Sequence, residues 1–180
     1  MEQLVKKAIK GDREAFAALI QNNMQSLYKT AWIYLKNDAD VADAVQDTIL
    51  TCFEKIHTLQ KPKYFKTWMI RILINKSTDI LRKKLNVADA GNIMESYSME
   101  PQYEQCEWKL LMNALEEKYS VVLNLYYYDE LSVKEISKLL GVKQNTVLTR
   151  LRRGRQLLRK ELEGGCAFNN EKLVYRHCDE

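Results

Sequence analysis

The segment from Leu131 to Lys160 constrains the fold most, because it predicts two helices joined by a short turn. Ser132 is followed three residues later by Glu135, and this capping-box spacing marks the start of a helix. Gly141 follows the apolar positions of that helix, where the departing chain favours the positive φ that glycine adopts at little cost. A second apolar period then begins at Val147. The segment therefore predicts a helix-turn-helix.

The second of these helices is strongly basic. Between Lys143 and Lys160 the sequence contains seven Lys or Arg residues and no acidic residue. A helix that packs through its apolar face and is positive elsewhere is suited to the major groove of duplex DNA. The alternative interpretation is a pair of core helices with a solvated basic face.

The remainder of the chain contains few helix-breaking residues. Its 180 residues include two prolines and six glycines, which predicts an all-α fold. No run of about eighteen apolar residues occurs, so neither export nor a membrane span is predicted. The four cysteines are widely spaced, which favours free thiols in the cytoplasm over a metal site at Cys166, His177 and Cys178.

Apolar spacing predicts three helices before residue 86. The first covers 13–35 after the capping residue Asp12, and the third covers about 64–84 after Pro62. The second begins after Asn37, and its predicted inward face comprises Val41, Val45, Ile49, Phe53 and Ile56.

The charge distribution divides the chain into blocks. Residues 61–84 contain eight basic residues and one acid, whereas residues 86–117 contain seven acids and one base. From 86 to 103 the apolar period is lost, which predicts a flexible linker. We therefore expect two small helical domains, 1–85 and 104–162, joined by that linker and followed by a tail, 163–180, without an assigned role.

Three motifs resemble one family. Asp43-Ala-Val-Gln-Asp47 resembles the Asp-x-Val-Gln-Glu helix of bacterial sigma factors, and the segment 65–82, which begins Phe-Lys-Thr-Trp, resembles their promoter-melting helix. The helix-turn-helix, including Asn145-Thr-Val147, resembles their fourth conserved region. The resemblance covers about 1–85 and 104–162. With only these two blocks, the chain is similar to an extracytoplasmic-function (ECF) RNA polymerase sigma factor.

The resemblance implies an alternative sigma factor that binds core RNA polymerase, directs it to specific promoters and assists promoter melting. It implies that 1–85 is region 2, which binds polymerase and the −10 element, and that 104–162 is region 4, which binds the −35 element. It implies no enzymatic activity and no cofactor. The implied partners are the clamp helices of the polymerase's large subunit, promoter DNA, and an anti-sigma factor that is often membrane-anchored.

The resemblance also implies three binding surfaces. The acidic patch would bind core polymerase and comprises Asp43, Val45, Gln46 and Asp47. The melting surface would bind the −10 element and comprises Lys61, Lys63, Tyr64, Lys66, Arg71, Asn75, Lys76 and Asp79. The recognition surface would bind the −35 element and comprises Lys143, Gln144, Asn145, Thr146, Thr149, Arg150, Arg152 and Arg153.

The residue chemistry agrees with these roles without requiring them. Carboxylates and an amide on a helix can dock a basic coiled coil, although a solvated helix face would contain the same residues. An amide such as Asn75 can hydrogen-bond a base edge while nearby cations hold phosphates. Trp68 continues the apolar period, so its spacing favours the core over a base-stacking platform.

Two positions depart from the family pattern in the recognition helix. Leu148 stands where a basic or polar residue is usual, so it either contacts a thymine methyl or packs. Gly154 stands where alanine is usual, at a cost of about 1 kcal/mol in helix propensity.

The sequence fits two other classes of protein less well. A helix-turn-helix regulator that acts without being a polymerase subunit explains the C-terminal half but not the two N-terminal motifs. An enzyme is disfavoured because His57 and His177 lie far apart in sequence and no glycine-rich phosphate loop or nucleophile elbow occurs.

Overall fold

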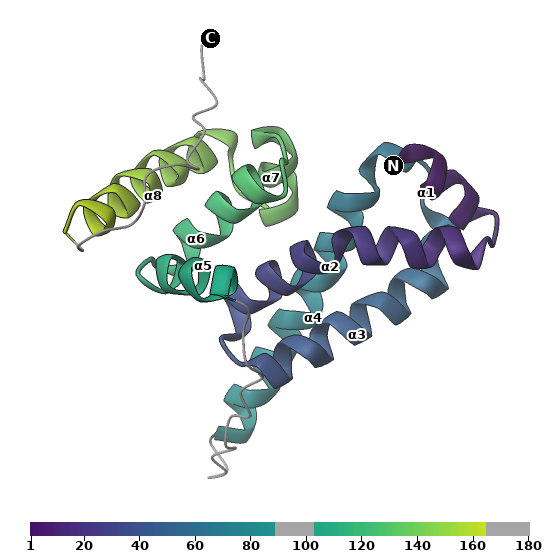
Figure 1. The fold of residues 1–180 in the computed structure, drawn as a ribbon, viewed down its shortest axis with the longest axis horizontal. Helices are drawn as coiled ribbons and strands as arrows, with labels where there is room; N and C mark the ends of the chain where they lie inside the picture. Colours follow the sequence, from purple (N-terminus) through teal and green to yellow (C-terminus); the bar gives the residue numbers. More distant parts are fainter. Residues whose placement is uncertain (89–102, 165–180) are drawn as a thin grey trace.

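The computed structural model describes residues 1–88 and 103–164, and all regular elements in these ranges are helical, as predicted. The N-terminal half contains α1 (Glu2–Ile9), α2 (Arg13–Leu35), α3 (Asp38–Lys55), the 3₁₀ turns η1 (Ile56–Thr58) and η2 (Pro62–Tyr64), and α4 (Phe65–Ala88). The C-terminal half contains α5 (Tyr103–Asn113), α6 (Glu117–Leu123), the π-helical η3 (Asn124–Tyr128), α7 (Val133–Leu140) and α8 (Gln144–Gly164). Figure 1 shows the two halves side by side.

The helix boundaries of the N-terminal half follow from local capping. The Asp12 side chain accepts a hydrogen bond from the Ala15 amide at 3.0 Å and starts α2 with the predicted bounds. Lys36 ends α2 with a φ of 55°, and Asn37 caps α3 by accepting a hydrogen bond from the Asp40 amide at 3.0 Å. The resulting core lies between α2, α3 and α4.

One position on the predicted inward face of α3 was wrong. Phe53 is 49% exposed rather than inward, because each four-residue step turns a helix about 40° past a full turn and places Phe53 about 80° from Val45. Cys52 occupies the inward position instead. In addition, α4 continues to Ala88, past the predicted linker start at 86. Residues 89–102 of the predicted linker and residues 165–180 of the predicted tail, with Cys166, His177 and Cys178, lie outside the described residues.

The two halves share a packed boundary. Ile33 on α2 and Ile70 on α4 are buried in the same hydrophobic cluster as the core residues of α6, η3, α7 and α8. The Trp32 ring meets the Trp108 ring edge-on at a centroid distance of 5.6 Å. The apolar core of the C-terminal half therefore continues into the N-terminal half through Ile33 and Ile70.

None of the helices within 1–88 and 103–164 is long and apolar enough to cross a membrane. The Cys52 thiol is free and buried, and burial raises its pKa to about 12. Its thiolate, the nucleophilic form, is therefore scarce at neutral pH.

Candidate nucleic-acid interface

The turn between α7 and α8 is fixed by hydrogen bonds and backbone geometry. Ser132 and Glu135 form the predicted capping box: the Glu135 amide donates to Ser132 Oγ at 3.3 Å, and the Ser132 amide donates to Glu135 Oε2 at 3.0 Å. Gly141 ends α7 with a φ of 66°, and Ser137 Oγ donates to the Val142 carbonyl at 2.6 Å. The helix-turn-helix is therefore confirmed.

The recognition surface faces solvent along the start of α8. Val147 and Leu151 are buried and turn that helix toward α6 and α7. Thr146 and Arg150 are half-buried, and the exposed members of the surface are Lys143, Gln144, Asn145, Thr149, Arg152 and Arg153. Leu148 lies among them and is 51% exposed, so it does not belong to the core.

Gly154 allows α8 to approach α6 closely. A Cβ at this position would lie 2.8 Å from Cδ1 of Leu123 and 3.4 Å from Cβ of Tyr119, and both of these residues are buried. The close packing of α8 on α6 thus offsets the loss of helix propensity at Gly154.

The N-terminal part of the melting surface surrounds a hollow. Tyr64 is 40% exposed, and Lys63 Nζ lies 4.8 Å from the centre of its ring. The hollow has a volume of about 250 Å³ and is lined by Thr58, Leu59, Gln60, Lys61, Tyr64 and Trp68. Trp68 is half-buried and packs against the core, so it contributes to the core and also lines the hollow.

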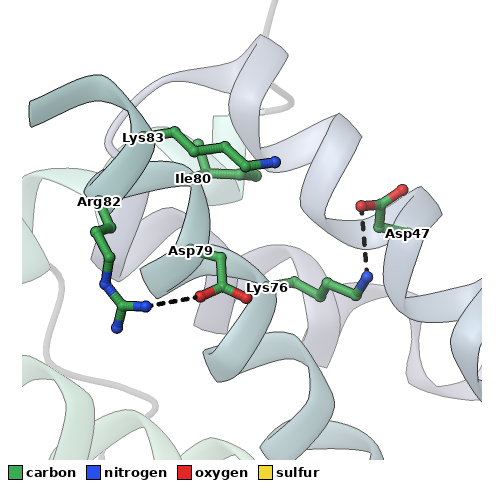
Figure 2. A pocket seen from close by; sticks show the side chains of 6 residues that line it. All are labelled: Asp47, Lys76, Asp79, Ile80, Arg82 and Lys83. Atoms are coloured by element: carbon green, nitrogen blue, oxygen red, sulfur yellow. Dashed lines mark hydrogen bonds and ion pairs between the residues drawn. The ribbon is translucent and has the colours of Figure 1, made fainter. Parts of the chain in front are cut away.

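The other part of the melting surface adjoins the acidic patch. Figure 2 shows Lys76 of α4 directed at Asp47 of α3, with an Nζ–Oδ2 distance of 3.7 Å, and Asp79 paired with Arg82 at 3.4 Å. These side chains line a hollow of about 230 Å³. Asn75 is exposed nearby. Two of the predicted surfaces therefore meet at a pair of opposite charges.

The middle of the melting surface is engaged by the C-terminal half. Lys66 Nζ lies 3.3 Å from Oδ1 of Asp129, and the Lys66 side chain is 24% exposed. Arg71 Nη2 donates to the Lys138 carbonyl on α7 at 3.2 Å. The C-terminal half thus covers Lys66 in part, whereas Arg71 is hydrogen-bonded but stays exposed.

Asp129 is the centre of a buried hydrogen-bond network. Its carboxylate accepts hydrogen bonds from Ser26 Oγ, from Thr30 Oγ1 at 3.3 Å and from Asn124 Nδ2 at 3.1 Å, and its side chain is fully buried. Burial raises the pKa of Asp129, and the hydrogen bond from Ser26 and the charge of Lys66 oppose that rise only in part.

The acidic patch is exposed at Asp43, Gln46 and Asp47, whereas Val45 is buried in the core. Val45 therefore fixes the orientation of α3 and does not contribute exposed surface. Two apolar side chains continue the exposed stripe: Leu50 is 62% exposed and Phe53 is 49% exposed.

Sequence reasoning missed the Asp129 network and the apolar end of the patch. Leu50 lies four residues after Gln46 and three after Asp47, so helical spacing alone could have identified it. Asp129 gave no comparable signal, because its partners Ser26 and Thr30 precede it by about a hundred residues.

Comparisons with known proteins match both halves. Residues 19–86 match the family described as sigma-70 region 2, and residues 107–158 match sigma-70 region 4. The RNA polymerase sigma factor SigV of Bacillus subtilis is 32% identical over 146 residues, covering 79% of this chain and 88% of SigV. The ECF RNA polymerase sigma factor SigW of the same organism is 31% identical over 188 residues, covering 90% of this chain and 98% of SigW.

Two solved structures share the fold. The sigma factor RpoE in complex with the anti-sigma factor NepR from Bartonella quintana has a TM-score of 0.70 at 22% identity, covering 82% of this chain and 96% of that chain. CnrH in complex with the cytosolic domain of CnrY has a TM-score of 0.64 at 23% identity, covering 91% and 97%. Because the matches include both halves, a regulator with unrelated N-terminal helices finds no support.

Proposed function

Because the chain belongs to the ECF RNA polymerase sigma factors, we propose a division of its binding work among the three surfaces described above. As an alternative sigma factor it binds core RNA polymerase, directs it to promoters and assists their melting. In our assignment, residues 1–85 bind polymerase and the −10 element, and residues 104–162 bind the −35 element. We place this activity in the cytoplasm.

The recognition surface reads the −35 duplex in this proposal. The observation that supports this role is that the N-terminal part of α8 exposes amide, hydroxyl and guanidinium groups. Asn145 and Arg153 provide hydrogen-bonding groups suited to base edges, and Leu148 provides an apolar contact for a thymine methyl. Arg155, Arg159 and Lys160 follow on the same basic helix and hold phosphates, which adds affinity but no sequence preference.

The melting surface binds the unpaired −10 strand. The hollow between Tyr64 and Trp68 accepts an unstacked base, because aromatic rings provide a surface for base stacking. Asn75 hydrogen-bonds a base edge, while Lys61, Lys63 and Lys76 hold the backbone.

The acidic patch docks core polymerase together with Leu50 and Phe53. Charged side chains steer the encounter with a basic surface, and desolvation of the two apolar side chains adds affinity that salt does not screen. Val45 acts indirectly, through the packing of α3.

An anti-sigma factor is the remaining partner in the proposal. The fold is shared with RpoE, which was crystallised with the anti-sigma factor NepR. A protein that covers the acidic patch would compete with polymerase for this chain.

The test is reconstitution with core RNA polymerase. Purified protein and core enzyme are incubated with fragmented genomic DNA, and the 5′ ends of the transcripts are sequenced to define the promoters. Discrete start sites preceded by shared −35 and −10 sequences are expected, and absence of a complex with core would contradict the function.

Asn75→Ala then tests the melting surface. Loss of one hydrogen bond in the opened strand lowers initiation on duplex promoters by about tenfold. Initiation is restored on a template mismatched across the −10 element, because that template needs less opening. If the variant loses initiation equally on both templates, Asn75 does not act in promoter melting.

A further inference from the structure

Helix α1 and its C-terminal cap contain three exposed lysines that belong to none of the three surfaces, namely Lys6, Lys7 and Lys10 (the α1 lysines). Residues 1–10 contain a single acid, Glu2, which lies in the first turn of the helix. No ion pair joins an α1 lysine to a carboxylate within residues 1–88 and 103–164. The three ammonium groups are therefore available to an anionic partner.

Apolar contacts hold α1 in a fixed place. Val5 and Ala8 are buried, at 0% and 3% exposure, and the partly buried Leu4 and Ile9 pack against the same core. At 3.6 residues per turn, the α1 lysines fall on the helix face opposite these four apolar positions. Packing of the apolar face therefore turns all three lysines toward solvent.

The part of the molecule that α1 packs against is the part that forms the hollow beside Trp68. Helix α1 contacts η1 and η2, and Figure 1 shows it beside the segment that leads from α3 into α4. Thr58 of η1 and Tyr64 of η2 line that hollow. Lys61 and Lys63 are exposed in the same segment. The α1 lysines thus lie at the same end of the N-terminal half as the proposed base-stacking site.

The two ends of α4 are directed to different parts of the promoter. Ala88, at the far end of α4, leads toward the half assigned to the −35 element, which lies upstream of the −10 element. The start of α4, with the hollow and α1, therefore faces downstream. Helix α1 has 8 residues and is about 12 Å long, a length that about four nucleotides of a stacked strand cover at roughly 3.4 Å each.

We propose that the α1 lysines bind the phosphates of the unpaired non-template strand immediately downstream of the −10 element, and so extend the melting surface beyond the hollow. This inference rests on the proposed −10 role of the hollow. Lysine suits this contact because its ammonium group binds phosphate as a point charge, which adds affinity without sequence preference.

A structural use of the same charges makes a different prediction. Lys6 and Lys7 lie in the last turn of α1, where positive charge stabilises the C-terminal end of a helix. Loss of that contribution would reduce helix content. Loss of phosphate contacts would instead reduce the affinity for a strand that reaches α1, and would reduce its dependence on salt.

The test uses the full chain bound to core RNA polymerase, with labelled non-template oligonucleotides from a promoter defined by 5′-end sequencing. One oligonucleotide stops at the −10 element, a second continues about four nucleotides at its 3′ end, and a third continues about four at its 5′ end. Fluorescence anisotropy measures each affinity at several salt concentrations. Circular dichroism of each variant measures helix content.

Lys6→Gln combined with Lys7→Gln should bind the 3′-extended oligonucleotide about fivefold more weakly, and the slope of log K against log salt should fall by about 1.4 for two lost phosphate contacts. Affinity for the other two oligonucleotides should not change. Lys6→Arg combined with Lys7→Arg keeps both charges and should bind like the wild type. The matched control is Lys134→Gln combined with Lys138→Gln, two exposed lysines on the 8-residue α7, and it should change none of the affinities.

A Gln pair that binds the 3′-extended oligonucleotide like the wild type would overturn the inference. Equal weakening with all three oligonucleotides, or a loss of helix content that accounts for the weakening, would also overturn it. If the wild-type complex fails to bind the shortest oligonucleotide, the −10 role of the hollow is wrong. A salt-dependent loss confined to the 3′-extended oligonucleotide would still support the α1 contact in that case.

Discussion

The recognition surface and the melting surface are both basic, but they differ in what their side chains already contact. Along the start of α8, six of the eight recognition residues are exposed, whereas Lys66 and Arg71 of the melting surface are bonded to the C-terminal half. Duplex DNA can therefore reach the recognition surface of the free molecule. Single-stranded DNA meets a less open melting surface, because the ion pair with Asp129 leaves the Lys66 side chain 24% exposed.

The difference also appears in how each surface is supported. The recognition helix is held by packing within its own half, with Val147 and Leu151 buried and Gly154 against Leu123. The melting surface relies on α4, which packs on α2 and α3 and also touches α7. A change inside the C-terminal half should thus damage recognition first.

Replacing Gly154 by Val is expected to have the largest effect. The added side chain would collide with buried Leu123, and such overpacking should lower the free energy of unfolding by about 3 kcal/mol. Thermal unfolding followed by circular dichroism measures the change. Gly154→Ala is the matched control, because its gain in helix propensity opposes a smaller collision. A Val variant as stable as the wild type would show that α6 and α8 can move apart without cost.

Replacing Arg153 by Ala tests sequence reading without disturbing the core. If its guanidinium reads a base, the variant should lose about 2 kcal/mol against the cognate −35 sequence and discriminate less between sequences. Electrophoretic shift with cognate and scrambled −35 duplexes measures both quantities. Lys160→Ala is the control and should weaken binding to the two duplexes equally. Equal losses for Arg153→Ala would reassign that residue to phosphate contact.

Replacing Leu50 by Ala tests the apolar end of the acidic patch. We expect polymerase affinity to fall by about 1 kcal/mol at both low and high salt, because an apolar contact is not screened. Leu110 on α5 is 63% exposed, compared with 62% for Leu50, so Leu110→Ala is a matched control outside the patch. If both variants bind core polymerase like the wild type, docking rests on the charged residues alone.

Acidification should have the smallest effect of the four changes. It should strengthen the packing between the halves through Asp129 and weaken it through Asp38. The pKa of Asp129 is raised above 3.8, so its contribution to stability is fullest below 3.8 and is lost as pH rises through its folded value. For Asp38, burial opposes ionisation, but hydrogen bonds from Tyr28 and Lys109 outweigh it and lower the pKa below 3.8. Its contribution is present above 3.8 and is lost as pH falls through the folded value.

The packing between the two halves should therefore strengthen as pH falls from neutrality toward 3.8 and weaken below it. Small-angle X-ray scattering across this range measures the radius of gyration, which increases if the halves come apart. Asp129→Asn should remove the strengthening, and Asp38→Asn should remove the weakening below 3.8. Unaltered profiles in both variants would mean that other groups control the boundary.

Local signals predicted much of the fold. Asp12, Ser132, Glu135 and Gly141 act through hydrogen bonds or a φ value within a few residues of themselves, and each was read correctly from the sequence. Phe53 was misplaced because a four-residue period drifts off the inward face of a helix of this length.

Features that depend on distant segments could not be read from the sequence. The packing reason for Gly154 requires Leu123 on another helix, and the burial of Asp129 requires α2 from the other half. Aspartate side chains are usually exposed, so the residue type alone predicts that Asp129 lies at the surface. The three predicted surfaces follow from family resemblance, and the variants described above test their roles.

The positions of Ile33 and Ile70 bear on how the protein can be produced in pieces. Both are almost completely shielded, at 1% and 0% exposure, within the cluster formed by the C-terminal half. A fragment ending near residue 88 would present these two side chains to water beside the orphaned hydroxyls of Ser26 and Thr30. Such a fragment would tend to self-associate, and polar replacements at Ile33 and Ile70 are the natural choice for anyone expressing the N-terminal half alone.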